Sequence, residues 1–311
     1  MPGYITHYLG GQSALTASTQ KIRNYIAPMD KLFNLGTQGP DIFFYYIPGF
    51  ISKRLRAVGT QMHHSDLGQF ILAMANQIKG YKSPSQRRIV FAYVAGFLAH
   101  YAVDVITHGY VYAQTHFPPA GDAVEATRHH HFETSIDVLM LDMMRGQKPA
   151  EYKLEKLIMP KEVHKLAAAK ATSAAIRQVY ARDITPQDVY RAMGQMANLT
   201  NVLQSKNGLR KRIIGSIESA FTRTQYVSTL IHMQEVTDTC RDYLNLKKAE
   251  WAAPWAPEVY RNESFTELFE MAVDEAAVMI QALYDYVKDE ITIERLAEVI
   301  QNRSLKTGFE V

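Results

Sequence analysis

The chain has 311 residues, of which 47% are hydrophobic, and its 34 basic and 31 acidic residues give a formal net charge of +3. A balance this close to neutral predicts no nucleic-acid partner and no strong attraction to anionic membranes. The single cysteine, Cys240, excludes a disulfide within the chain and any cysteine-based metal site.

The first residues and the apolar stretches predict a soluble, cytoplasmic protein. The opening MPGYITHYLGG lacks the basic start and the apolar run of a signal peptide. No uncharged apolar run reaches the roughly 18 to 20 residues needed to cross a bilayer. The length suits one large domain or two modest ones of about 150 residues each.

Apolar residues recur at helical spacing along most of the chain. The predicted helices cover residues 68–78, 87–106, 132–145, 162–180, 185–204, 210–235, 264–288 and 292–302. Turn-forming residues interrupt the pattern at 36–41, 80–85, 116–122, 145–151 and 251–258. Ser264 and Glu267 fit a capping box at the start of one helix. Because there is neither an alternating strand pattern nor a nucleotide-binding glycine loop, the sequence predicts an all-α, multi-helical bundle.

Polar residues on an apolar helix give the first indication of a site. His100, Asp104 and His108 are spaced four apart, so they share one face of the helix. They span roughly 12 Å along the axis, which is too far for one metal ion that binds its ligands at about 2.0–2.2 Å. Two ions fit if the two oxygens of Asp104 bridge them. A cation would also offset the penalty of burying this carboxylate without a partner.

A second predicted helix repeats this spacing. His129 and Glu133 are four residues apart, and Asp137 follows one turn later. Three adjacent histidines on a helix point about 100° apart, so at most one or two of them face inward. We therefore interpret His130 and His131 as surface residues or as residues that support the ligands.

Further candidate ligands lie toward the start of the chain. Nine of the eleven histidines lie at or before residue 131. His7, Asp41 and either His63 or His64 add nitrogen and oxygen donors, a set that suits zinc and leaves manganese or iron open. The sequence has no H-E-x-x-H and no E-x-x-H motif, which argues against a zincin and against a di-iron bundle.

Taken together, these residues form an ordered series of potential ligands. In chain order the series is His7, Asp41 in GPD, His63 in MH, His100 and Asp104 in HYAVD, His108, and His129 and Glu133 in HHHFE. This series resembles the ligand order of the zinc-dependent phospholipase C family, whose members are helical enzymes. The later segments DYLNLKKAEWAAPW and NESFTELFEMA are similar to intracellular members from Gram-positive bacteria.

The resemblance implies how the ligands are shared among two or three zinc ions. Asp41, His63, His100 and Asp104 would hold one ion, His108, His129 and Glu133 a second, and His7 with a bridging Asp104 a third. In secreted members the free N-terminal amine completes the third site. This chain departs from them there, because it begins Met-Pro. The third site would be completed by the amine of Pro2, exposed after removal of the methionine and five residues from His7, or by a backbone carbonyl.

The resemblance also implies the chemistry. Zinc lowers the pKa of bound water from 15.7 to about 7, which gives hydroxide at neutral pH. Asp41 is expected to act as a ligand, as the base that orients the attacking water, or as both. We therefore expect a phospholipase C-type phosphodiesterase that acts on a phospholipid or on a small phosphodiester. The alternatives are a nuclease or phosphomonoesterase of related fold, and a metal-bound interaction protein without turnover.

The candidate ligands divide the chain into two regions. Residues 1–150 are predicted to form the metal-binding catalytic domain, and residues 151–311 a helical scaffold or lid that is either separate or continuous with it. The aromatic run at 43–46 is interpreted as a pocket wall or as core packing. Peripheral membrane contact and the oligomeric state stay open at this point.

Overall fold

The computed structural model describes residues 3–46, 50–115, 123–203, 208–221, 228, 230–236 and 238–311. The helices are α1 (Tyr4–Ala17), α2 (Gln20–Ile26), α3 (Asp30–Gly36), α4 (Phe50–His64), α5 (Leu67–Gly80), α6 (Pro84–Thr115), α7 (Ala123–Arg145), α8 (Leu154–Leu157), α9 (Glu162–Tyr180), α10 (Pro186–Val202), α11 (Leu209–Phe221), α13 (Phe265–Val287) and α14 (Ile293–Ile300). Two short 3-10 helices are η1 (Ala27–Met29) and η2 (Gly39–Phe43). The part of the chain that is described contains no β-strand, so the predicted all-α bundle is confirmed.

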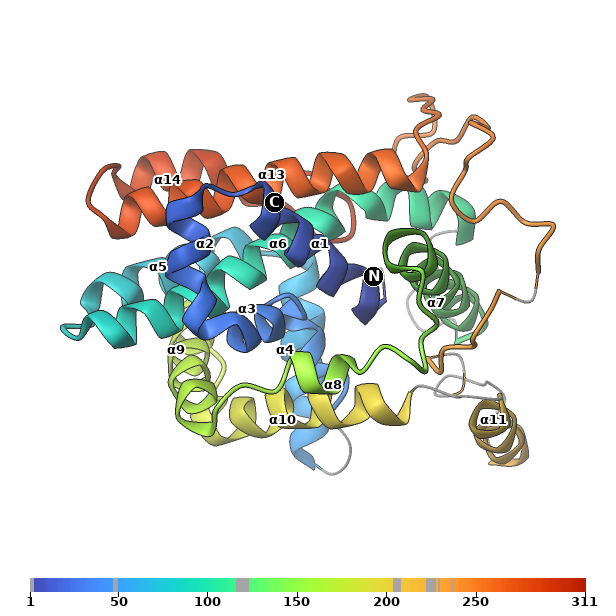
Figure 1. The fold of residues 1–311 in the computed structure, drawn as a ribbon, viewed down its shortest axis with the longest axis horizontal. Coiled ribbons are helices and arrows are strands. Elements are labelled where there is room, and N and C mark those ends of the chain that lie inside the picture. Colours follow the sequence, from blue (N-terminus) through green and yellow to red (C-terminus); the bar gives the residue numbers. More distant parts are fainter. Residues whose placement is uncertain are drawn as a thin grey trace.

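Helix α6 lies at the centre of the molecule (Figure 1). It contacts α1, α3, α5, α7 and α9, and α13 packs along it. Its length and hydropathy would suit a membrane span, but 94% of its most apolar 18-residue window is buried inside the protein. This degree of burial is typical of a core helix, because a helix that is apolar on all sides needs partners on all sides.

A close approach between α3 and α6 places the segment that carries Asp41. A Cβ atom on Gly36 would lie 2.2 Å from the carbonyl oxygen of Tyr93, and one on Gly96 would lie 2.0 Å from that of Phe33. Glycine at both positions lets the two backbones come this near. The chain therefore leaves α3 beside α6, and η2 presents Asp41 to the helix that bears three other candidate ligands.

Several predicted helices are longer in the structure. The helix predicted at 87–106 continues to Thr115, and the one predicted at 132–145 begins at Ala123. The sequence prediction missed α1, α2, α3, α4 and α8. Helix α1 is buried on nearly every side and so shows no amphipathic periodicity. The turn predicted at 116–122 lies outside the described residues.

The helix predicted at 210–235 is wrong over its last residues, and residues 222–227 and 229 of it lie outside the described part of the chain. The described helix α11 ends at Phe221, and residues 230–236 are irregular. The chain turns back there, because the N–H of His232 donates to the carbonyl of Leu203 at 2.8 Å, next to the end of α10. Tertiary contacts thus override a local helical pattern.

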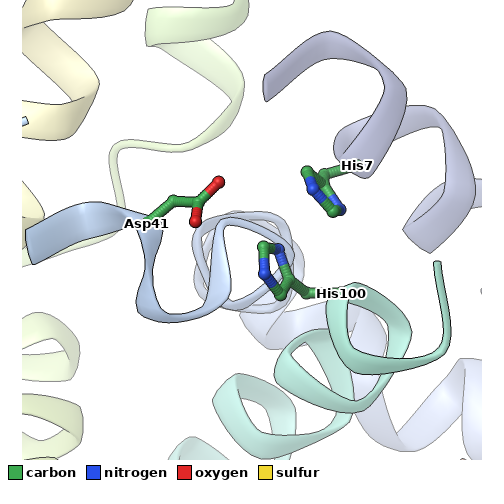
Figure 2. Close-up of side chains that lie close together, drawn as sticks. All are labelled: His7, Asp41 and His100. Carbon is green, nitrogen blue, oxygen red and sulfur yellow. The ribbon is translucent and has the colours of Figure 1, made fainter. Parts of the chain in front are cut away.

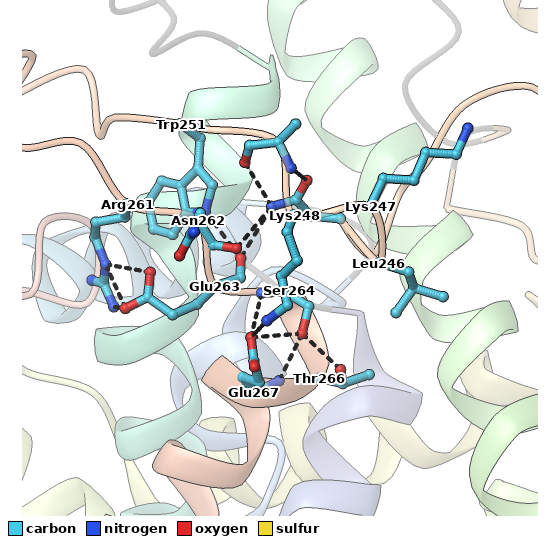
Figure 3. Close-up of polar contacts among 12 residues, drawn as sticks. Leu246, Lys247, Lys248, Trp251, Arg261, Asn262, Glu263, Ser264, Thr266 and Glu267 are labelled. Carbon is cyan, nitrogen blue, oxygen red and sulfur yellow. Dashed lines mark hydrogen bonds and ion pairs between the residues drawn. The ribbon is translucent and has the colours of Figure 1, made fainter.

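Polar contacts hold the chain just before α13, at residues 245–264 (Figure 3). Trp251 and Arg261 exchange backbone hydrogen bonds of 2.7 and 2.8 Å. The predicted capping box is confirmed, since Ser264 Oγ accepts from the N–H of Glu267 and the Glu267 carboxylate accepts from the N–H of Ser264. Lys248 also pairs with Glu267. These contacts fix the point at which α13 begins.

Residues 151–311 pack onto the same core as the first 150 residues. Helix α13 contacts both α6 and α1, and α9 contacts both α5 and α6. One cluster of buried hydrophobic side chains includes residues from Tyr4 to Leu305. The two regions therefore share one hydrophobic core. That the first binds metal and the second serves as a scaffold stays a prediction.

Asp137 of α7 supplies the cap that α1 lacks. The N-cap residue Gly3 has no capping side chain. Instead, the Asp137 carboxylate accepts hydrogen bonds from the N–H of Ile5 at 3.0 Å and from the N–H and hydroxyl of Thr6 at 2.8 and 2.6 Å. Nε2 of His232 lies 2.7 Å from the same carboxylate. A negative charge at a helix N-terminus is stabilising, so this contact anchors α1 against α7.

We expect Asp137→Ala to lower the free energy of unfolding by about 3–5 kcal/mol, because it leaves His232 and two buried N–H groups without their acceptor. The matched control is Asp142→Ala on the same helix, where the side chain is 53% exposed. This control should change stability by less than about 0.5 kcal/mol. Urea unfolding of both variants measures the difference, and equal losses would contradict the anchoring role.

Candidate metal centre

The structure brings together the eight side chains that the sequence singled out. They come from five elements, and each exposes 7% of its surface or less. The residues are His7 on α1, Asp41 on η2, His63 on α4, His100, Asp104 and His108 on α6, and His129 and Glu133 on α7. Their burial among apolar residues means that any charge they carry must be balanced within the cluster.

The carboxylate of Asp104 lies at the middle of this cluster. Its Oδ1 is 3.2 Å from Nε2 of His7 and 3.8 Å from Nδ1 of His108. Its Oδ2 is 3.1 Å from Nε2 of His100. The two oxygens thus face different histidines, which is the arrangement that a bridging carboxylate requires.

Three groups of donor atoms are compact enough to hold an ion. In each group one donor atom per residue lies within 4.8 Å of the others. The groups are His7, Asp41 and His100; His63, His100 and Asp104; and His108, His129 and Glu133. Figure 2 shows the first group, with side chains from three elements that point into one space. Since the first two groups share His100, they form one continuous half of the centre.

Helix α7 forms the other half. Nε2 of His129 lies 2.7 Å from Oε1 of Glu133, and Nδ1 of His130 lies 3.4 Å from Oε2. The ring of His129 faces that of His108, with centroids 6.3 Å apart, and lies 4.7 Å from the ring of Tyr112. Because His130 contacts Glu133, we interpret it as a residue that supports this candidate ligand and not as a surface residue alone.

Backbone carbonyls orient two of the histidines. Nδ1 of His63 lies 2.6 Å from the carbonyl oxygen of Gly59, and Nδ1 of His100 lies 3.1 Å from that of Thr37. A carbonyl oxygen only accepts hydrogen bonds, so each Nδ1 must carry the proton. In the neutral ring Nε2 then keeps its lone pair, and Nε2 is the atom that faces the carboxylates.

His108 and His129 are oriented in the same way. Nδ1 of His108 contacts the carbonyl oxygen of Leu305 and must donate to it. Nδ1 of His129 lies 3.1 Å from Oγ1 of Thr115, and this hydroxyl donates its own proton to the carbonyl of Val111 at 2.8 Å. Thr115 therefore accepts from His129. Hydrogen bonds of this type from the second ring nitrogen are usual for histidines that bind metals.

Lone pairs therefore face carboxylate oxygens across the cluster, a repulsive arrangement that a cation between them removes. Nε2 of His63 lies 3.2 Å from Oδ1 of Asp41, and the His129–Glu133 contact is of the same kind. Among the described residues, buried polar atoms without a hydrogen bond include both ring nitrogens of His7, Nε2 of His100 and His108, and both oxygens of Asp104. These imidazole and carboxylate donors fit zinc.

The electrostatics favour neutral rings for His108 and His129 beside an ionised Asp104 carboxylate. Burial lowers the pKa of His108 and of His129 well below the usual range. Burial alone would raise the pKa of Asp104, but the surrounding histidines outweigh it and hold that pKa well below the usual value. Burial would also lower the pKa of His100, yet the carboxylates of Asp104 and Asp41 raise it overall.

The structure distinguishes between His63 and His64 as candidate ligands, which the sequence alone does not. His63 is 3% exposed and faces Asp41, whereas His64 is exposed. In the aromatic run at 43–46, Phe43 belongs to the hydrophobic core, and the ring of Phe44 lies 5.1 Å from that of His63. The amine of Pro2 lies outside the described residues.

Sequence reasoning missed the groups that orient the ligands. The carbonyls of Thr37 and Leu305 leave no signal in a sequence, because every residue has a carbonyl. The sequence shows Asp137 one turn after Glu133, but the spacing does not indicate that it caps α1. For His232 the sequence offers one indication, which is that only two histidines follow residue 131.

Fold and site together define an all-α protein with a buried cluster of zinc-type donors. The sequence model of the family described as zinc dependent phospholipase C matches residues 6–182, more than half of the chain. The chain belongs to the zinc-dependent phospholipase C family, whose members are metal-dependent hydrolases. The matched range contains all eight candidate ligands. No curated protein and no solved structure matches the chain significantly.

We expect Asp104→Asn to lose zinc, because it removes the charge between the two halves of the cluster and keeps the side-chain shape. The purified protein should carry about two zinc ions or more, at least one for each half. Metal analysis of the variant should find at least about one ion fewer. Asp30→Asn, at an exposed residue on α3, is the control. Full zinc retention by Asp104→Asn would rule out the bridge.

Without metal, the protein should lose stability as the pH falls from about 6.5 to about 4. Burial holds the pKa of His130 at about 4 and that of His108 and His129 well below normal. The unfolded chain, with histidine pKa values near 6.5, therefore binds protons first and is favoured by acid. The raised pKa of His100 opposes this trend as a single group. Urea unfolding with chelator at pH 7.5 and pH 5 checks it; equal stabilities would contradict the expectation.

Proposed function

We propose that this protein is a zinc-dependent phosphodiester hydrolase of the phospholipase C type that acts on a phospholipid or a small phosphodiester. Membership of the family supports the reaction class. The observation that carries the proposal is the set of Nε2 lone pairs that face buried carboxylates across the cluster. Zinc, when bound, supplies Lewis acidity toward water and phosphoryl oxygens.

Asp41 is the residue to which we assign the reacting water. It lies in η2, whose backbone is fixed because the N–H of Asp41 donates to Gln38 and its carbonyl accepts from Phe44. In Figure 2 its carboxylate points toward the space between His7 and His100. A carboxylate held this way can orient water as a base and also contribute to the metal set.

Aromatic side chains packed beside the α7 half of the centre support a lipid substrate. Tyr112 packs on His129, with ring centroids 4.7 Å apart. Trp255 packs edge-on against Tyr112 at 5.7 Å. Aromatic side chains at this position suit the apolar part of a phospholipid next to the headgroup. Of the alternatives, nucleic-acid cleavage is disfavoured by the net charge of +3, since phosphate backbones are usually bound by basic patches.

The test of function is hydrolysis by zinc-loaded protein of a nitrophenyl phosphodiester and of phospholipid in mixed micelles. We expect turnover of at least one of them, and Asp41→Asn should lower kcat about 100-fold or more. Asp30→Asn is the control, because this residue lies on the exposed side of α3.

The outcomes separate the candidate functions. Hydrolysis of single-stranded nucleic acid in preference to both diesters would favour the nuclease alternative. Stoichiometric zinc binding without hydrolysis of any of these substrates would favour a metal-bound interaction protein.

A further inference from the structure

The chain after α14 returns to the candidate metal centre, although it carries none of the eight candidate ligands. Residues 301–311, which we call the strap, lie outside the range of the family match. The strap folds back on itself, because the N–H of Ser304 donates to the carbonyl of Phe309 and the N–H of Gly308 donates to the carbonyl of Ser304, each at 2.8 Å. The side chain of Leu305 is fully buried. The strap is therefore a folded part of the protein with a defined shape.

One side of the strap holds the end of α4, the helix that carries His63. The hydroxyl of Ser304 donates to the backbone carbonyl of His63 at 3.2 Å. The side-chain oxygen of Asn302 accepts from the N–H of Gly68, in the first turn of α5, at 3.0 Å. Because Asp66, the N-cap residue of α5, makes no capping hydrogen bond, Asn302 supplies the cap. The strap thus binds both helices on either side of the turn between α4 and α5.

The other side of the strap lies against α6. The carbonyl of Leu305 accepts from Nδ1 of His108. The N–H of Arg303 donates to the hydroxyl of Tyr101 at 2.8 Å, and the Arg303 side chain pairs with Glu275 on α13. The strap is therefore anchored on the central helix at two points, one of which is a candidate ligand.

The close approach of the strap to α6 depends on Gly308. This residue has φ +74°, and a Cβ atom there would lie 2.7 Å from the carbonyl oxygen of Val105. Gly146, just after α7, has a similar φ of +60°, but a Cβ atom there would meet nothing within 4 Å. Substitutions at these two glycines therefore separate backbone strain from a displacement of the strap.

The position of His63 relative to α6 depends on what holds the end of α4. This helix packs mainly on η2, which carries Asp41, and to a lesser extent on α5. His63 must nevertheless place a donor atom within 4.8 Å of those of His100 and Asp104 on α6. The strap joins the backbone of His63 to the ring of His108 through two neighbouring residues, so it spans the distance that has to be kept.

We propose that the strap positions His63 and His108 relative to each other, with Ser304 as its positioning residue, so that the zinc affinity of the centre depends on this segment. The inference rests on the zinc centre of the proposed function but not on hydrolysis. Groups that orient metal ligands raise the affinity for the ion, because the ligands are already in place when the ion binds.

The first test compares the zinc affinity of the wild type, Ser304→Ala and Ser173→Ala by competition with a fluorescent chelator. Ser173 is the matched control, because it is buried as well and its hydroxyl donates to the backbone carbonyl of Ile184 at 2.6 Å, on a helix without candidate ligands. We expect Ser304→Ala to weaken zinc binding about tenfold or more. Ser173→Ala should keep the affinity of the wild type, although urea unfolding should show a similar loss of stability in both variants.

A second pair of variants, Gly308→Ala and Gly146→Ala, keeps the inference testable if Ser304→Ala does not fold. We expect Gly308→Ala to weaken zinc binding about tenfold or more. It should also change the visible absorption spectrum of the protein loaded with Co²⁺, because this spectrum reports how the ligands are arranged around the ion. Gly146→Ala should alter neither the affinity nor the spectrum.

The outcomes separate a positioning role from a general contribution to stability. Zinc affinities of Ser304→Ala and Gly308→Ala that equal those of their controls would overturn the inference, as would an equal loss in all four variants. Zinc affinity that depends on Ser304, in a protein that hydrolyses no diester, would uphold this inference while the proposed hydrolysis fails. A wild type that binds no zinc would overturn both.

Discussion

The ionised carboxylate of Asp104, fully buried halfway along the central helix, is the constraint on which the rest of the structure depends. Such a charge is stable inside a protein only if opposite charge or hydrogen-bond donors reach it. Two histidines approach from its own helix, and His7 approaches from α1. Each further element of the centre is placed so that its ligand comes within reach of this side chain or of its neighbours.

Two kinds of contact that involve no candidate ligand position Asp41 and His7. The glycine contacts between α3 and α6 bring η2 and Asp41 next to His100. Gly39 allows a similar close approach at the site itself. It has φ +50°, and a Cβ atom there would lie 2.3 Å from the His100 ring. The Asp137 carboxylate fixes α1 through its first N–H groups, so His7 is positioned by α7.

The parts of this site that the sequence predicts are those contained within one helix. His100, Asp104 and His108, and likewise His129 and Glu133, are related by helical spacing alone, and the structure places each set on one face. A sequence records spacing within a helix but not contacts between helices. The cap of α1 by Asp137 and the ring orientation by Leu305 therefore appear only in three dimensions.

A related limit explains two of the errors in the fold. Helices with one apolar face, such as α13, follow from periodicity and from the capping box of Ser264 and Glu267. Helix α1 is surrounded by protein on nearly every side, so it has no polar face. Without a polar face its sequence shows no helical periodicity. The irregular stretch at 230–236 has an apolar pattern as well, but His232 is held there by Leu203 and Asp137.

These contacts also bear on how the two regions of the chain relate to each other. All eight candidate ligands lie within residues 6–182, yet the groups that hold two of them in place lie beyond that range. Leu305 orients His108 directly, and His232 acts on α1 through Asp137. Because ligand orientation controls metal affinity, the second region is part of the metal centre even though it supplies no ligand. The orientation of the candidate ligands in the N-terminal region therefore depends on the packing of the C-terminal one.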